Sequence, residues 1–135
     1  MASIRKEFQV AAPPDKVWAV LADFGAVDKL APGFVTECHL DEDGVRNITF
    51  SNGATAREWL VDRDAASRRL AYAIIGGRPT HYGAAAQVFP EPDGGSRFVW
   101  VVDVLPNELA GYIGAQMDLG LAAMKVALEK EAVAG

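Results

Sequence analysis

The fold is decided by the last long stretch of the chain, which reads PNELAGYIGAQMDLGLAAMKVALEKEAV over residues 106–133. Its large apolar residues recur at spacings of three and four, the pattern of a helix with one buried face. They are Leu109, Ile113, Met117, Leu121, Met124 and Leu128, whereas Glu108, Ala115, Asp118, Ala122, Lys125 and Glu129 fall on the opposite side. Pro106 suits the first helical position. A helix of this length is roughly 40 Å long, so a single sheet would have to curve to cover it.

Gly120 is the most informative of the glycines inside this predicted helix. A glycine in a helix costs about 1 kcal/mol relative to alanine, so a reason for its presence is expected. Gly120 lies on the apolar stripe, with Gln116 at the edge of the stripe, where a helix that only packs would carry a bulky residue. Either the helix lines a hollow at this point, or the glycine lets another element approach closely. The sequence leaves both explanations open.

The composition indicates one globular domain over residues 1–135. The chain has 135 residues, of which 50% are hydrophobic, enough for a substantial core. A net charge of −5 without a basic cluster argues against a nucleic-acid partner. The single Cys38 excludes an internal disulfide, and no metal-ligand cluster or cofactor motif is present in the sequence. Charges at residues 5, 6 and 7 replace the apolar run of a signal peptide, and no stretch reaches membrane-spanning length, so we expect a cytoplasmic protein without membrane insertion.

Upstream of residue 106, the pattern is one of short alternating strands separated by turn residues. Two short helices are expected at 15–21 and 26–30, and strands at 3–10, 34–41, 45–51, 55–63, 69–75, 80–89 and 96–103. Short connections such as Asn52-Gly53 force neighbouring strands to be antiparallel. We therefore predict an α+β fold, in which one curved antiparallel sheet of seven strands wraps the long C-terminal helix. A sheet bent around a helix leaves space toward one end, which is a natural cavity for a small molecule.

Alternation within each strand predicts which side chains face the helix. The inward set is Phe34, Thr36, Cys38, Leu40, Arg46, Ile48, Phe50, Leu70, Tyr72, Ile74, Thr80, Tyr82, Ala84, Ala86, Val88, Phe98, Trp100 and Val102. Ala84 and Ala86 are small and leave volume unfilled. Residues 55–63 are apolar on both sides, so either Arg57 or Glu58 must face inward.

A buried Glu58 would need a cation, and the inward registers of neighbouring strands offer Arg46 and Lys6. The candidates for the polar part of a cavity are accordingly Lys6, Arg46, Glu58, Thr80, Tyr82 and Gln116. In the alternative interpretation, Lys6 and Arg46 lie at strand ends and reach water, and Tyr82 is an ordinary core residue.

The whole chain resembles the polyketide cyclase/dehydrase and lipid-transport branch of the START and birch-pollen-allergen-like (SRPBCC) superfamily, whose members have the helix-grip fold. The resemblance rests on the order and spacing of several short motifs. They are Ala12-Pro13-Pro14-Asp15-Lys16-Val17-Trp18 followed by Asp23-Phe24, then Gly44-Val45-Arg46, Asn52-Gly53, Glu58 with Asp62 and Asp64, Leu70 and Tyr72 ahead of Gly76-Gly77, Gly94-Gly95-Ser96-Arg97 before Trp100, and Gly120-Leu121.

The same pattern is similar to a shortened version of the plant abscisic-acid receptors. That resemblance implies a gate loop at Ser51, Asn52, Gly53 and Ala54, and a latch loop at Gly76, Gly77, Arg78 and Pro79. It also implies that Glu58 is the cavity carboxylate and Tyr82 the cavity tyrosine, so that Glu58 rather than Arg57 faces inward. The chain departs from the receptors at Pro32, near their ligand-binding lysine, and in its shorter latch without a histidine. The resemblance thus implies a gated cavity and no named ligand.

Three functions follow as hypotheses. The first is a binding module for a small hydrophobic or amphipathic molecule, with cavity residues Ile48, Phe50, Glu58, Leu60, Tyr72, Ile74, Tyr82, Ala84, Ala86, Trp100, Ile113, Gln116, Met117 and Gly120. The second is a cyclase or dehydratase in which Glu58 is the base and Tyr82 or Arg46 the donor. The third is a partner-binding or oligomeric role, as monomer or dimer, through the gate loop or a strand edge.

Overall fold

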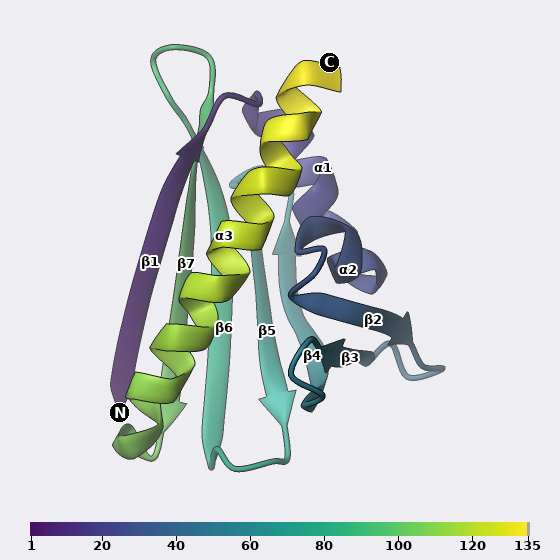
Figure 1. Ribbon diagram of the computed structural model, residues 1–135, viewed down its shortest axis with the longest axis vertical. Helices are drawn as coiled ribbons and strands as arrows, with labels where there is room; N and C mark the ends of the chain where they lie inside the picture. The colour runs from purple at the N-terminus through teal and green to yellow at the C-terminus, as the bar shows by residue number, and fades with distance from the viewer. Residues whose placement is uncertain (135) are drawn as a thin grey trace.

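A seven-stranded antiparallel sheet bends around one long helix in the computed structural model, which describes residues 1–134 (Figure 1). The strands are β1 (Ala2–Val10), β2 (Val35–Leu40), β3 (Arg46–Phe50), β4 (Thr55–Asp64), β5 (Arg69–Ile75), β6 (His81–Pro90) and β7 (Ser96–Leu105). The helices are α1 (Pro14–Ala22), α2 (Val27–Leu30) and α3 (Ala110–Ala134), with 3-10 turns at Phe24–Ala26 and Asn107–Leu109. The predicted helix-grip architecture is confirmed.

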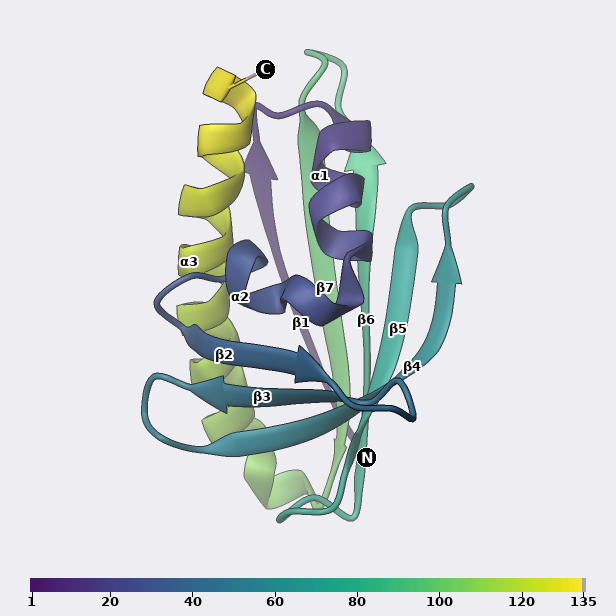
Figure 2. The ribbon, with the colours of Figure 1, turned by 90° about the vertical axis from the view of Figure 1, so that its right-hand side faces the viewer.

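The strand order in the sheet is β1-β7-β6-β5-β4-β3-β2, so β1 and β2 form the two edges. β2 and β3 run across the direction of β5, β6 and β7, and β4 turns from one direction to the other (Figure 2). The register of β4 against β5 shifts between Leu60 and Asp62. Because a bulge bends its strand and increases the local twist, this irregularity helps the sheet to close around α3.

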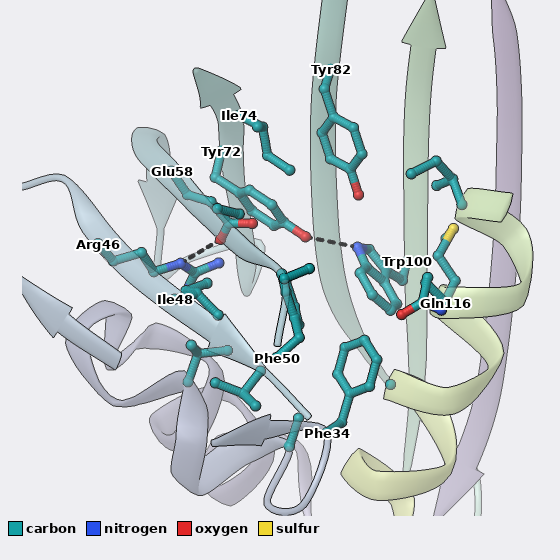
Figure 3. Close-up of a pocket in the computed structure, with 18 of the residues that line it drawn as sticks. Phe34, Arg46, Ile48, Phe50, Glu58, Tyr72, Ile74, Tyr82, Trp100 and Gln116 are labelled. Atoms are coloured by element: carbon teal, nitrogen blue, oxygen red, sulfur yellow. Dashed lines mark hydrogen bonds and ion pairs between the residues drawn. The ribbon is translucent and has the colours of Figure 1, made fainter. Parts of the chain in front are cut away.

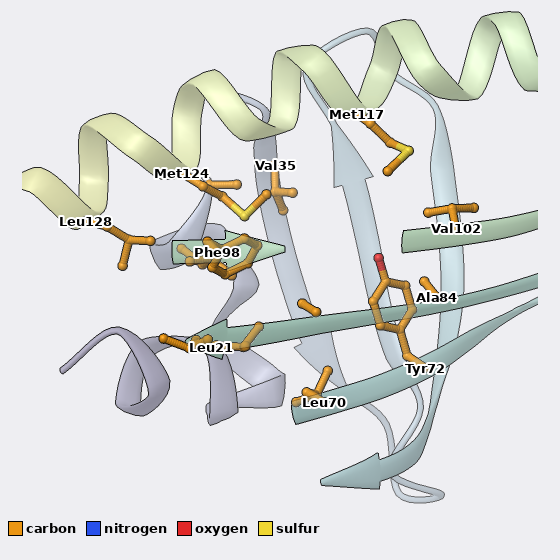
Figure 4. Close-up of a cluster of buried hydrophobic side chains, with 14 of the residues drawn as sticks. Leu21, Val35, Leu70, Tyr72, Ala84, Phe98, Val102, Met117, Met124 and Leu128 are labelled. Carbon is orange, nitrogen blue, oxygen red and sulfur yellow. The ribbon is translucent and has the colours of Figure 1, made fainter. Parts of the chain in front are cut away.

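The helix α3 presents the predicted apolar stripe to the sheet. Leu109, Met117, Met124 and Leu128 are buried, and the side chains of α3 meet Phe98 and Val102 of β7 in the core, among others (Figure 4). One detail of the prediction is wrong. Pro106 is extended, with φ −72° and ψ 160°, and a 3-10 turn separates it from α3. None of the helices within residues 1–134 combines the length and the apolar character needed to cross a membrane.

The predicted inward register fails in β2 and at the start of β6. A register shift between Val35 and Glu37 turns Val35 into the core and Thr36 to the surface, where its hydroxyl donates to the Thr49 carbonyl at 3.2 Å. Leu40, at the far end of the same strand, is 49% exposed. Thr80 precedes β6 and is exposed as well. Strict alternation does not report a bulge or the end of a strand, which explains these errors.

Candidate ligand-binding cavity

A cavity of about 530 Å³ lies between the concave face of the sheet and α3. Its walls are mostly apolar and are formed by strands of the sheet, the α2 region and α3. They include Ile48 and Phe50 of β3, Ile74 of β5, Ala86 of β6, Trp100 of β7, and Ile113 and Met117 of α3. The α2 region closes one side with Val27, Leu30, Ala31 and Phe34. The volume falls within the usual range of small-molecule sites.

Most of the cavity residues expected from the sequence lie around this space: Ile48, Phe50, Glu58, Tyr72, Ile74, Tyr82, Ala86, Trp100, Ile113, Gln116, Met117 and Gly120. Leu60 and Ala84 are not part of the wall. Leu60 directly precedes the irregularity in β4, and Ala84 pairs in the sheet with Tyr72 and Val102, whose larger side chains reach further toward α3. Of the expected gate loop only Ala54 reaches the cavity, whereas Ser51, Asn52 and Gly53 lie outside the wall. All four latch residues, Gly76, Gly77, Arg78 and Pro79, line it.

Arg46 and Glu58 form a buried ion pair at one end of the cavity (Figure 3). The two residues face each other across β3 and β4, and the Arg46 Nε atom lies 2.7 Å from Glu58 Oε1. Both side chains are only 5% exposed. Arg57, the other candidate for the inward position, is exposed and lies 3.5 Å from Asp41. Glu58 therefore supplies the buried carboxylate, as the resemblance implied.

The surroundings of Arg46 hold its guanidinium group in place. One of its nitrogens donates to the Phe24 carbonyl at 3.3 Å, and the group stacks over the Phe24 ring at 4.0 Å and the Tyr72 ring at 4.8 Å. The interpretation in which Arg46 reaches water is therefore wrong. Burial raises the pKa of Glu58, and the Arg46 charge opposes this effect only in part. The pair brings no net charge into the cavity while Glu58 is ionised.

Two polar groups point into the cavity without a partner from the described residues. The Tyr72 hydroxyl accepts a hydrogen bond from Trp100 Nε1 at 3.1 Å. The Tyr82 hydroxyl and the Gln116 side-chain amide, by contrast, make no hydrogen bond within residues 1–134, and both face the cavity (Figure 3). Burial, together with the nearby Glu58 charge, raises the pKa of Tyr72 and of Tyr82. Both phenols are therefore neutral, and Tyr82 has a proton to donate to a ligand.

The mouth of the cavity lies between the gate loop, the latch loop and the start of α3, where exposed residues join the wall. Tyr112 of α3 contacts both loops. Its hydroxyl accepts from Asn52 Nδ2 at 3.5 Å, and the Arg78 guanidinium lies 5.9 Å from the centre of its ring. The apolar periodicity did not predict Tyr112, because this residue lies beside the apolar stripe and not on it. Both contacts are exposed and weak, so Tyr112 adds only a weak link between the two loops at the opening.

Both explanations for Gly120 apply. The residue is buried and lines the cavity. A Cβ atom at this position would lie 3.2 Å from ring atoms of both Phe34 and Trp100, so the absence of a side chain lets the two aromatic rings approach the helix. Gly120 thus shapes the cavity indirectly, by allowing the rings that form part of its wall to sit against α3.

Lys6 is not a cavity residue. Its side chain extends to the surface and pairs with Asp118 of α3, with 3.0 Å between Nζ and Oδ1. Here the alternative interpretation, in which the lysine reaches water, holds. No group of three or more His, Cys, Asp or Glu side chains within residues 1–134 has the arrangement of a metal site.

Other wall residues were missed for lack of a sequence signal. Val27, Leu30 and Ala31 come from a four-residue helix and the turn after it, which is too short to show a period. Val35 became inward only through the bulge in β2. The position of α2 against the cavity is a tertiary feature that no local pattern reports.

The long helix held in a bent antiparallel sheet, with a cavity between them, defines a helix-grip protein. Residues 1–129 match the family described as polyketide cyclase / dehydrase and lipid transport. The chain belongs to this family, as its resemblance to the SRPBCC superfamily predicted. No curated protein matches the chain.

Solved structures share the fold. A protein from Bacillus thuringiensis is 20% identical with a TM-score of 0.83, over 94% of this chain and 98% of that one. A protein from Thermobifida fusca is 28% identical with a TM-score of 0.78, over 96% of this chain and 95% of that one. Norcoclaurine synthase from Thalictrum flavum, solved with dopamine and hydroxybenzaldehyde, is 23% identical with a TM-score of 0.74, over 98% of this chain and 87% of that one.

Proposed function

We propose that the chain acts as a single cytoplasmic domain that encloses a small hydrophobic or amphipathic molecule in the cavity between its sheet and α3. The observation that carries this proposal is the largely apolar cavity of about 530 Å³ that contains unpartnered polar groups on its wall. Burial of a ligand's apolar surface would supply the affinity, at about 25 cal/mol per Å² before the costs of association. The family's description, which includes lipid transport, supports the same function.

The polar groups of the wall suggest how the ligand is oriented. Tyr82 offers a hydroxyl donor, and Gln116 offers both a donor and an acceptor. Arg46 and Glu58 compensate each other, so the end of the cavity beside this pair favours a neutral polar group such as a hydroxyl or carbonyl. An ionic group at this end would lose its hydration without gaining a free counter-charge.

The binding function is tested with the dye 1-anilinonaphthalene-8-sulfonate, whose fluorescence rises in apolar sites. We expect saturable binding to the wild-type chain and at least ten-fold weaker binding to Ala86→Trp, which fills the cavity. Ala85→Trp is the matched control, because Ala85 is adjacent on β6 and points to the outer face of the sheet. Ile113→Trp repeats the test from the helix wall if Ala86→Trp fails to fold. Equal binding by the wild-type chain and both folded cavity variants would refute the proposed site.

An enzyme is the second candidate, and one observation favours it. Glu58 has a raised pKa and lies in a cavity that also holds the neutral Tyr82 hydroxyl. A carboxylate of this kind can remove a proton next to a carbonyl, and a tyrosine hydroxyl can donate to the resulting oxyanion. A structural neighbour, norcoclaurine synthase, is a synthase. Against this, Arg46 already occupies one oxygen of Glu58.

Glu58→Gln separates the two functions. The substitution keeps the shape of the side chain and removes its ability to accept a proton. A binder retains affinity within about ten-fold for whatever molecule native mass spectrometry finds with the purified protein, whereas an enzyme loses turnover of that molecule by orders of magnitude. Unchanged turnover in Glu58→Gln would exclude Glu58 as the base.

A further inference from the structure

The solvent side of α3 carries a second row of apolar residues, of which Tyr112 also borders the mouth of the cavity. Tyr112, Leu119, Val126 and Val133 are 46%, 58%, 59% and 90% exposed. They follow one another at intervals of seven residues. α3 lies on the outside of the molecule, and its far side faces solvent along the length of the helix (Figure 1). We call this row, together with Ala115 and Ala122 between its members, the outer seam.

The spacing of the outer seam is that of a coiled coil. Large residues every seven positions, alternating with a second position three residues later, form the contact line of two paired helices. The second position holds Ala115, Ala122 and Glu129, of which the two alanines allow close approach. A helix meant only to cover the sheet has no need of apolar residues on the side opposite the core.

We propose that the outer seam pairs with the outer seam of a second copy of this chain, with the two α3 helices antiparallel. If Leu119 of one copy packs against Ala122 of the other, the same register sets Val126 against Ala115. It also brings Asp118 of each copy opposite Lys125 of its partner, which gives two ion pairs related by the two-fold axis. Asp118 is 62% exposed, so it can be shared between Lys6 and the second copy.

The charges select this direction over the parallel one. In a parallel pair, a residue beside the seam faces the residue five positions further along the second copy. Lys125 of each copy would therefore face Lys130 of the other, which gives two lysine–lysine contacts. Like charges at such positions are unfavourable. In the antiparallel register Lys130 lies level with the uncharged Gly111 of the second copy instead. The pattern is therefore self-complementary only when the helices run in opposite directions.

A second copy fits this surface better than a lipid membrane does. The solvent side of α3 holds Asp118 and Glu129 as well as Lys125 and Lys130, so it has no excess of positive charge to attract anionic lipids. One pair of helices of this length gives an interface at or below the low end of specific complexes, on the order of 1,200 Å² in total. We therefore expect a reversible dimer with a Kd in the micromolar range.

Sedimentation equilibrium over about 10 µM to 1 mM tests the dimer. Leu119→Glu and Val126→Glu are each expected to weaken it at least ten-fold. Val61→Glu is the matched control, because Val61 is 64% exposed but lies on β4, away from α3. A chain that stays monomeric at 1 mM would overturn the proposal. A dimer that neither seam variant weakens would overturn it as well, and so would a chain that binds anionic phosphatidylglycerol vesicles through α3 but does not self-associate.

Charge exchange tests the direction of pairing. Asp118→Lys sets four lysines around the axis and Lys125→Asp sets four aspartates, so each variant alone is expected to be monomeric at concentrations where the wild-type chain pairs. An equimolar mixture of the two should form a heterodimer, since each lysine then faces an aspartate. The double variant Asp118→Lys with Lys125→Asp should dimerise again. Failure of both the mixture and the double variant to associate would refute the antiparallel register. Neither experiment involves the cavity, so the proposed dimer is tested independently of the proposed function.

Discussion

Replacing Arg46 by methionine tests the buried ion pair, on which the polar end of the cavity depends. The substitution keeps a side chain of similar length but removes the guanidinium group, so Glu58 loses its only ionic partner within the described residues. It also removes the donor to the Phe24 carbonyl and the cation that stacks between Phe24 and Tyr72. A buried carboxylate without a counter-charge is strongly unfavourable.

The expected loss is about 3–5 kcal/mol, the usual cost of breaking a buried pair from one side. For 135 residues at about 2.1 cal/mol/K each, the unfolding entropy is about 280 cal/mol/K, so the melting temperature falls by about 10–18 °C. The double variant Arg46→Met with Glu58→Leu removes both charges. It is expected to lie within about 1 kcal/mol of the wild-type chain or above it, since apolar replacements of buried pairs are often neutral or stabilising.

The loss in Arg46→Met also depends on pH. Burial raises the pKa of Glu58 already in the wild-type chain, and removal of the Arg46 charge raises it further. A carboxyl whose pKa is higher in the folded state is penalised in its ionised form. The penalty is therefore absent below the unfolded pKa and complete above the folded one. The deficit of Arg46→Met relative to the wild-type chain should accordingly be smaller at pH 5 than at pH 8.

Urea denaturation of the wild-type chain, both single variants and the double variant at these two pH values measures each quantity. The double-mutant cycle gives the coupling between Arg46 and Glu58, which we expect to exceed 2 kcal/mol at pH 8. A loss below 1 kcal/mol for Arg46→Met, or a deficit that is equal at both pH values, would show that Glu58 is neither buried as a charge nor dependent on Arg46.

Three further substitutions probe the cavity and its support. Tyr82→Phe removes a hydroxyl that has no protein partner within residues 1–134, so the free energy of unfolding should change by less than about 1 kcal/mol while ligand affinity falls. A large loss of stability in urea would place that hydroxyl in the core instead. Ser96→Ala removes the donor to the Ala12 carbonyl, 2.7 Å away and fully buried, and should cost about 1–3 kcal/mol by the same assay. A neutral result would mean that water satisfies that carbonyl. Gly95→Ala sets a Cβ atom 2.6 Å from the Val10 carbonyl oxygen, so thermal melting should show a loss of about 1–3 kcal/mol, and an unchanged melting temperature would contradict this close approach.

The alternation of apolar and polar residues was sufficient to predict the architecture, because periodicity is a local property that each element carries in its own sequence. The seven strands, the short helices and the buried stripe of α3 were all found in this way. The resemblance to the plant abscisic-acid receptors added the inward orientation of Glu58, which alternation alone had left open between Arg57 and Glu58.

The local pattern did not decide the features that arise from contact between distant elements. The bulge in β2 turned Val35 into the core and Thr36 out of it, and the irregularity in β4 follows Leu60. Both depend on how strands pair, which a single strand does not encode. Lys6 and Arg46 occupy similar apolar registers in the sequence. Arg46 contacts the Glu58 carboxylate and two aromatic rings from other elements, whereas Lys6 pairs with Asp118 at the surface. The position of α2 and the mouth at Tyr112 likewise come from packing. Periodicity thus decides which face of an element is buried, and tertiary contacts decide what each buried side chain meets there.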